Sequence, residues 1–478
     1  MIGQRIRVDS AEKNLFLILC VLLGASFLGF QIVAQDHSIL AICLLGVTPL
    51  VLIAKRPVLG LYLIAVLTPL NQLQQFEFPF FSSLIRVIGL VTLLSFLAHY
   101  LITAEYRFIR TELFPPMSVF VFAYVVGLYR SDDPNDALAQ VLVLSMYFAL
   151  YLLVVNLVRD RKTVTRMFTV LTLVASTLAV FGILQFFTGE TFFTPETETF
   201  ETFGVRGQSV IRVIGFFDNP NAFAYNFVLV IPLMIGLLLT QRKRLHQLIT
   251  IGLLAMCTLC LFLTFSRSAF LALWVSVFII LLFMKSPQKV MIGMGFLGVL
   301  TALYALTPDL FDILHFRMLS TSNYMGIHQR IELMKGGIVT FSTHPFIGSG
   351  TGNAPIMLGE YTYNFRHGAH NNLIAVLVET GLLGFIPFCL IFINFTKKTL
   401  AGIARTVDRN SRIVLVVILA SIWGYFVNGL FHTSLAYGLW WMILGMGMAY
   451  ANMSEENGYL NGRFALTHGG MEKKSSPS

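Results

Sequence analysis

Charged side chains are scarce in this chain. Only 12% of its 478 residues are Asp, Glu, Lys or Arg, whereas 56% are hydrophobic. A soluble protein of this length could not cover so much apolar surface with so few charges. Apolar runs long enough to cross a bilayer recur along nearly the whole chain. The composition therefore excludes a soluble globular enzyme and predicts an all-α polytopic membrane protein.

Cysteine is also scarce, and the five cysteines (Cys20, Cys43, Cys257, Cys260 and Cys389) all lie inside apolar runs. The Cys257-x-x-Cys260 spacing occurs in metal and redox sites, but no second pair accompanies it. Packing within membrane helices is the expected role of these residues, and no disulfide framework is predicted. The internal repeats typical of secondary transporters are lacking as well.

The hydropathy pattern predicts about 12–14 transmembrane helices. The candidate segments are 14–34, 38–54, 57–70, 84–103, 113–129, 137–158, 164–187, 221–240, 247–265, 269–284, 290–306, 372–395, 413–431 and 434–451. With the N-terminus inside, most of the 33 Lys and Arg fall in the inner loops. Positive charge marks cytoplasmic loops, so the net charge of +9 reflects topology, and no nucleic-acid partner is expected.

These segments divide the chain into six predicted regions. They are N-terminal transmembrane helices (1–187), a first long periplasmic loop (188–220), central transmembrane helices (221–306), a large periplasmic loop (307–371), C-terminal transmembrane helices (372–451) and a cytoplasmic tail (452–478). Long loops in a compact membrane protein are usually functional, so chemistry is expected on the outer face. Basic residues expected there, against the charge bias, are Arg86, Arg130, Arg206, Arg212, Arg267, Arg317, Arg330, Lys335 and Arg366.

The first long loop ends in "VIRVIGFFDNPNAFAYNF". Asn219 before Pro220 predicts a helix start, with Asn at the N-cap and Pro in the first turn. Capping accounts for the polar residues Asp218 to Asn221, but it does not explain Arg212. Earlier in this loop, Glu196 and Glu198 could hold a divalent cation or form a solvated acidic stretch, and no metal site is predicted.

Arg267 interrupts an apolar run in "LFLTFSRSAFLAL", at the outer boundary between two segments. It is either an interfacial anchor, whose long side chain reaches the headgroups, or a ligand for an anion. The flanking serines and small residues offer no aromatic belt, which favours the anion ligand.

The second long loop contains "IHQRIELMKGGIVTF", in which Ile331, Met334 and Ile338 share a helical stripe and Arg330 lies on the other side. This pattern predicts an amphipathic helix at the membrane surface. "THPFIGSGTGN" follows, with Gly348, Gly350 and Gly352 at alternate positions. A tight turn explains them best, and a nucleotide loop is excluded because no strand precedes them.

The most polar cluster of the chain precedes an apolar helix in "RHGAHNNLIAVLVETGLLGF". Asn372 and Glu379 are seven residues apart and therefore share a helix face, with Glu379 about 10 Å deeper. A carboxylate at that depth normally faces a bundle interior or a wet cavity, where it could orient a histidine or arginine at the helix mouth. Interfacial capping by His370 and Asn371 is the alternative.

Four motifs in the same order resemble those of the O-antigen ligase and polymerase superfamily. They are "DNPNAFA", "SRSAFLAL", "HPFIGSGTGN" and "HGAHNNLIAVLVETGLLG", and the resemblance covers about residues 205–390. It implies a GT-C-like bundle with a large periplasmic loop in the bacterial inner (cytoplasmic) membrane. The implied activity is transfer of a glycan from undecaprenyl diphosphate to an acceptor hydroxyl on the periplasmic face.

The resemblance also implies roles for individual residues. His370 is expected to be the catalytic base with support from Glu379, and Arg212, Arg267 and Arg330 are expected to bind the diphosphate. Supporting positions are Asn219, Asn221, Asn371, Asn372, His367 and Arg366. The expected enzyme is a metal-independent, inverting glycosyltransferase without cofactor, and its partners are the lipid-linked donor, the acceptor and membrane lipid.

The motifs leave several alternatives open. A ligase that uses lipid A–core as acceptor is favoured over a polymerase that uses a second lipid-linked repeat unit. A lipid-linked glycan flippase or transporter is more distant, because charge gathers at outer loops rather than along helices. A non-catalytic partner of a polysaccharide assembly complex is a further alternative. The oligomeric state is not predicted.

Overall fold

A computed structural model of the chain describes residues 49–70, 79–102, 108–190, 202–205, 208–217, 219–285, 324–359 and 368–469, with the isolated positions 287, 293, 298 and 361. Two predicted segments, 14–34 and 290–306, and most of 38–54 lie outside the described residues or have no more than isolated positions within them. So do Asp218, Glu196, Glu198, Arg366 and His367.

The described apolar helices coincide with the predicted segments. They are α3 (Val58–Leu70), α4 (Pro79–Leu101), α5 (Phe114–Gly127), α6 (Pro134–Leu157), α7 (Arg161–Thr188), α8 (Pro220–Thr240), α9 (Arg244–Leu263), α10 (Arg267–Phe283), α15 (Asn372–Arg405), α16 (Arg409–Gly429) and α17 (Gly438–Gly469). Two of them are longer than predicted, because α15 continues past 395 and α17 continues past 451 into the segment expected to be a tail.

Seven of the described helices are long and apolar enough to cross a membrane, and three shorter apolar helices accompany them. Helix α17, which corresponds to the predicted segment 434–451, is in neither group. The seven helices confirm the predicted class, an all-α polytopic membrane protein. The total of 12–14 spans and the GT-C-like arrangement stay predictions, since part of the chain lies outside the described residues. One feature was not predicted: β1 (Thr202–Val205) and β2 (Gln208–Ile211) form an antiparallel hairpin in the first long loop.

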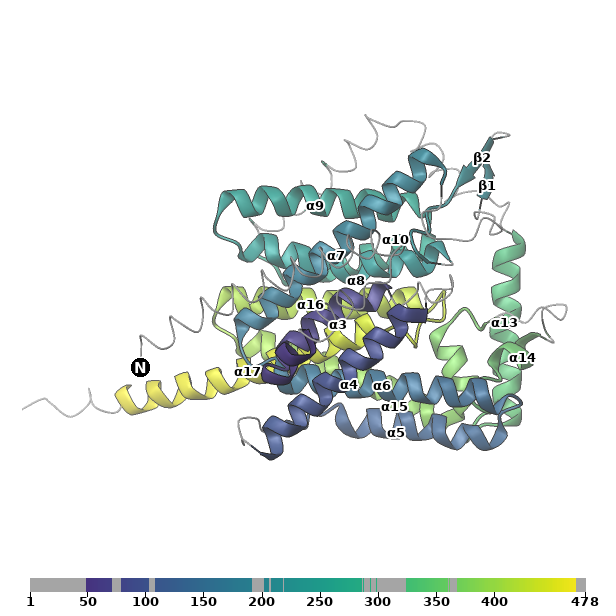
Figure 1. Ribbon diagram of the computed structural model, residues 1–478, viewed down its shortest axis with the longest axis horizontal. Helices are drawn as coiled ribbons and strands as arrows, with labels where there is room; N and C mark the ends of the chain where they lie inside the picture. The colour runs from purple at the N-terminus through teal and green to yellow at the C-terminus, as the bar shows by residue number, and fades with distance from the viewer. Residues whose placement is uncertain are drawn as a thin grey trace, which may run out of the picture.

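The helices lie side by side, and the hairpin, α13 (Tyr324–Thr343) and α14 (Ala354–Gly359) gather at one end, which we call the loop end (Figure 1). Helices α8 and α16 are buried over most of their length and pack against each other, because both are apolar all round. Helix α4 instead exposes Leu90 and Leu94, as expected of a lipid-facing helix.

The amphipathic helix was predicted correctly as α13, which crosses the loop end of the bundle (Figure 1). Leu333 is fully buried against the protein, whereas Ile331, Met334 and Ile338 are about half exposed. The apolar stripe of α13 therefore points away from the protein, as the predicted position at a membrane surface requires.

The opposite end carries most of the described ion pairs. Lys398 lies 2.7 Å from Glu112 and 2.8 Å from Glu455, and Arg405 lies 2.8 Å from Glu455. Arg161, at the start of α7, pairs with Asp408 at 2.8 Å. These cations belong to the stretches whose positive charge predicts the cytoplasmic side, although the structure places them in helix ends. Their partners connect α15 to α17 and to the segment before α5.

Helix α15 is broken at Gly381, whose backbone (φ 57°, ψ −153°) is not helical. The loop 344–353, with the glycine-rich motif, fills the break and satisfies the backbone groups that the helix leaves free, as a membrane-embedded break requires. The bridging hydrogen bonds run from Ser349 N to Val378 O (2.8 Å), Gly350 N to Glu379 O (3.2 Å), Leu382 N to Pro345 O (2.8 Å) and Leu383 N to Phe346 O (3.0 Å).

Glycine is required at this junction for steric reasons. A Cβ on Gly348 would lie 2.4 Å from the carbonyl carbon of Glu379, and one on Gly381 would lie 2.7 Å from Gly348 N. Gly348, Gly350 and Gly352 all have positive φ (72°, 119° and 80°), which other residues rarely adopt. The motif is therefore a tight turn, as predicted, and it packs the loop against α5 and α15.

Candidate functional site

Arg212 lies in the segment before α8 and is almost completely buried. Its Nε donates to the carbonyl of Thr264 (3.1 Å), and one terminal nitrogen donates to Asn221 Oδ1 (3.3 Å). Asn219 is the N-cap of α8, as predicted, because its side chain accepts from the backbone N–H of Asn221 at 2.7 Å. The start of α8 thus fixes the guanidinium of Arg212 against the turn between α9 and α10.

Arg267 is the first residue of α10, directly after that turn. Ser266 is the N-cap and donates through its hydroxyl to Asn221 Oδ1 at 2.8 Å. Asn221 therefore links Arg212 to Ser266, the residue before Arg267, and brings together two segments that are far apart in sequence. Phe265 in the turn has φ 48°, a conformation that is costly for a bulky residue and that recurs at functional sites.

Arg330 comes to the same place from α13. Burial lowers the pKa of Arg330, and the nearby positive charge of Arg267 adds to this shift. Within the described part of the chain, no carboxylate forms an ion pair with Arg267 or Arg330. Two guanidiniums close together without a counter-charge make a site for an anion.

His370 stands at the entrance of α15 and has φ 47°, the second left-handed non-glycine residue among those described. Asn371 is the N-cap of α15, and its Oδ1 accepts from the backbone N–H of Leu373 (2.8 Å) and of Ile374 (3.2 Å). Asn371 is thus used in capping, while the left-handed turn before it sets the direction of the His370 imidazole.

Asn372 joins the start of α15 to the connection between α16 and α17. Its Oδ1 accepts from Ser434 N at 2.7 Å, and its Nδ2 donates to Ser434 Oγ at 3.2 Å. Tyr425 donates to the carbonyl of Ser434 at 2.9 Å, which fixes the same connection from α16. The supporting role predicted for Asn372 thus has a concrete partner, although the prediction itself did not include Ser434.

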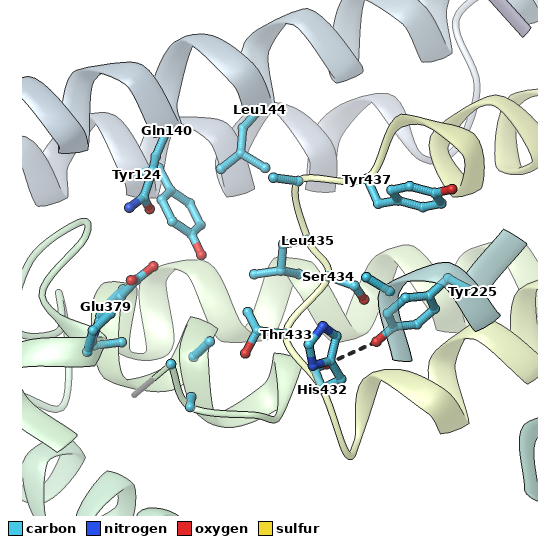
Figure 2. Close-up of a pocket in the computed structure, with 17 residues that line it drawn as sticks. Tyr124, Gln140, Leu144, Tyr225, Glu379, His432, Thr433, Ser434, Leu435 and Tyr437 are labelled. Atoms are coloured by element: carbon cyan, nitrogen blue, oxygen red, sulfur yellow. Dashed lines mark hydrogen bonds between the residues drawn. The ribbon is translucent and has the colours of Figure 1, made fainter. Parts of the chain in front are cut away.

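The α16–α17 connection also carries His432, to which the sequence reasoning gave no role. Its ring stacks on His370 with the centroids 6.0 Å apart, and it lies 5.6 Å from the ring of Tyr225. Tyr225 donates to the carbonyl of His432 at 3.3 Å (Figure 2). Burial lowers the pKa of His432 to about 3, with further contributions from His370 and Arg330, so this imidazole is neutral near pH 7.

A cavity of about 430 Å³ lies beside these residues (Figure 2). Tyr124 and Glu379 line one end, and Tyr225 and His432 line the other. Ala369, the residue before His370, also belongs to the wall. The cavity therefore reaches from the broken part of α15 to the surroundings of the predicted base.

Glu379 is buried at the cavity wall, as its depth on α15 predicted. The hydroxyl of Tyr124 points toward its carboxylate (Figure 2), and the backbone amides of Gly352 and Ala354 also interact with it. Its neighbours therefore come from α5 and from the glycine-rich loop. The sequence could not have identified Tyr124, since nothing in α5 distinguishes this tyrosine from a packing residue.

Metal ligands are not grouped in the described part of the chain, where no cluster of three or more His, Cys, Asp or Glu could hold an ion. Cys257 and Cys260 are buried free thiols in α9, as predicted. Arg330 lies near His432, whose ring stacks on the predicted base.

We compared the chain with known proteins and with models of protein families. No curated protein matches the chain. A family model described as O-antigen ligase matches residues 251–389, a segment that includes Arg267, Arg330, His370 and Glu379 but not Arg212. The matched segment, less than a third of the chain, is therefore similar to O-antigen ligases, and it contains three of the four motifs that carry the resemblance in the sequence.

Proposed function

We propose that this protein transfers a glycan from undecaprenyl diphosphate to an acceptor hydroxyl on the periplasmic face of the bacterial inner membrane. The observation that carries the proposal is the meeting of Arg212, Arg267, Arg330 and His370 at the loop end of the bundle. These residues come from four separate segments. Hydrogen bonds hold Arg212 and the start of α10, a ring contact joins His370 to His432, and Arg330 lies close enough to Arg267 to feel its charge.

The arginines fit the leaving group of this reaction. Cleavage of the glycosidic bond leaves negative charge on the lipid diphosphate, and fixed guanidiniums stabilise such charge strongly in a partly dry site. Arg267 and Arg330 lack a carboxylate partner among the described residues, so their charge is available to a ligand. The proposed reaction therefore uses arginine in the role that a divalent cation has in many glycosyltransferases.

His370 fits the role of general base. The acceptor hydroxyl must lose its proton as it attacks, and an imidazole with an ordinary pKa of about 6.5 suits that transfer. The stacked ring of His432 packs against His370, and the left-handed backbone sets its orientation. Attack from the face opposite the diphosphate would invert the anomeric centre.

We propose lipid A–core as the acceptor, which makes the enzyme an O-antigen ligase. The test is a purified preparation given a synthetic undecaprenyl diphosphate oligosaccharide and two acceptors in competition, lipid A–core and a second lipid-linked oligosaccharide. We expect the glycan on lipid A–core. Its appearance on the second carrier would identify a polymerase instead. If no glycan is transferred but the donor moves across vesicle membranes, the proposal of a transferase is wrong and the protein is a flippase.

The side of the membrane needs its own test. Ser342, exposed in α13, is replaced by cysteine, and Val407, exposed in the α15–α16 turn, is replaced in a second variant. An impermeant thiol reagent added to whole cells with a permeabilised outer membrane should label Ser342→Cys and spare Val407→Cys. Labelling of the α15–α16 turn alone would reverse the orientation and exclude a periplasmic site.

A further inference from the structure

The cavity beside His370 is lined by residues that the arginine site does not use. Its volume of about 430 Å³ lies in the range of small-molecule pockets, roughly 300–1,000 Å³. The lining comes from α5, α6, α8, α14, the start of α15 with the residues before it, and the α16–α17 connection. Segments that are distant in the sequence therefore converge around one volume.

Polar atoms in this wall lack partners. Among the described residues, neither His432 Nδ1 nor Thr433 Oγ1 has a hydrogen bond, although both atoms are buried. A buried polar atom without a partner costs about 1–3 kcal/mol. The hydroxyl of Tyr124 faces the same space, beside the carboxylate of Glu379 (Figure 2). A ligand rich in hydroxyl groups could donate to or accept from each of these atoms.

The charge of the wall differs from that of the neighbouring arginine site. No Lys or Arg is among the described residues that line the cavity, and Glu379 is the one acid there. A diphosphate would be repelled by Glu379 and attracted by Arg267 and Arg330, which lie outside the cavity. The cavity therefore suits an uncharged polar group, and the arginines suit the anion.

We propose that this cavity is a subsite for an uncharged sugar ring adjacent to the reacting bond, held by Tyr124, His432 and Thr433. The inference rests on the proposed glycan transfer. It adds to that proposal the binding site of one sugar ring. Ala369 in the wall precedes His370, and His432 stacks on it, so a ring in the cavity lies next to the base. The sugar can belong to the donor or to the acceptor, since both carry hydroxyls.

The two variants Tyr124→Phe and Thr433→Val each remove one hydroxyl and little volume. Tyr129→Phe and Thr177→Val are matched controls, because Tyr129 is exposed and the hydroxyl of Thr177 bonds only to its own helix in α7. KM is measured separately for the lipid-linked donor and for the acceptor. Loss of one hydrogen bond should raise one of these KM values by about 2- to 12-fold, with kcat changed less. If the KM for the donor rises, the sugar in the cavity belongs to the donor; if the KM for the acceptor rises, it belongs to the acceptor.

A binding measurement separates this inference from the proposed function. The detergent-solubilised wild type is heated with and without the free oligosaccharide of the donor, and again with a soluble core oligosaccharide. One of them should raise Tm in the wild type and in both controls, and raise it less in Tyr124→Phe and Thr433→Val. If an oligosaccharide raises Tm but no glycan is transferred, the sugar site is supported and the proposed transfer reaction is wrong. Transfer with unchanged KM and equal Tm shifts in all variants would reject the sugar site alone.

Discussion

The imidazole rings of His370 and His432 are stacked at 6.0 Å with an angle of 30° between their planes. One ring stands at the entrance of α15, and the other belongs to the connection between α16 and α17. His432 is held through its carbonyl by Tyr225, and His370 is held by its left-handed backbone. The proposed base is therefore positioned by two converging segments.

His370→Asn should abolish detectable transfer, with a loss of about 10²–10⁴-fold. Asparagine tolerates the left-handed backbone of position 370, so the variant removes the base with little strain. Product formation is measured at matched protein levels. His344→Asn, at a histidine whose ring is hydrogen-bonded to Thr343, should keep wild-type activity. If the His370→Asn enzyme is active, His370 is not the base, and His367 is the next candidate.

Arg267→Lys should lower kcat by about 10²-fold although the positive charge is kept, as expected when one donor to a developing anion is lost. Lysine lacks the planar fork that grips two phosphate oxygens, and Arg267 sits at the first turn of α10 without a described carboxylate partner. Transfer rates at saturating donor measure the effect. Lys335→Arg, exposed on α13 and paired with Glu332, is the control for a surface cation. Wild-type turnover in Arg267→Lys would reduce the residue to an interfacial anchor.

The stability of the protein should fall as the pH drops below about 6.5. The unfolded chain binds a proton at His432 with an ordinary pKa of about 6.5, whereas the folded protein holds this group neutral down to about 3. Acidification between these values therefore favours the unfolded state, and above 6.5 this group has no effect. Tm between pH 4.5 and 8 should decline less in His432→Gln than in His344→Gln. Parallel curves for the two variants would contradict this role.

Gly381→Ala should destabilise the protein by about 1–3 kcal/mol or more, because the new Cβ meets Gly348 N at 2.7 Å in a left-handed backbone. Tm of the purified protein and its yield in the membrane report the effect. Gly252→Ala in α9, with nothing within 4 Å of the added Cβ, should leave Tm unchanged or slightly higher. Equal Tm values would show that the break in α15 does not constrain the fold.

Glycan transfer should persist in excess EDTA. The proposed diphosphate ligands are arginines, which repel Mg²⁺ or Mn²⁺ rather than hold it. Initial rates with EDTA, with EDTA followed by Mg²⁺, and without additive are compared on one preparation. Activity that disappears in EDTA and returns with the cation would make the reaction metal-dependent and direct attention to Glu196 and Glu198.

Local signals in the sequence identified those features that depend on neighbouring residues. The start of α8 at Asn219 and Pro220, the apolar stripe of α13 and the tight turn at Gly348 to Gly352 all follow from patterns a few residues long. These features needed no knowledge of the packing. The outer arginines were identified because they contradict the charge bias of the loops.

Features that depend on distant partners could not be predicted. The break at Gly381 looks like ordinary helix in the sequence, since "ETGLLG" has no helix-breaking proline and the loop that fills the gap is not adjacent. Nothing in the sequence near His432 distinguished it, and only the fold brings it onto His370. The hairpin β1–β2 was missed because its strands are four residues each.

The way in which α15 is broken has a consequence for biogenesis. The bridging partners Pro345, Phe346, Ser349 and Gly350 all precede α15 in the chain, and so does α5, whose Gly127 accepts from Thr351 N at 3.1 Å. When α15 leaves the ribosome, every group that its exposed amides and carbonyls need has already been synthesised. Helix α15 can therefore enter the bilayer together with the loop 344–353 that fills its break. The free backbone groups at Gly381 then never face lipid.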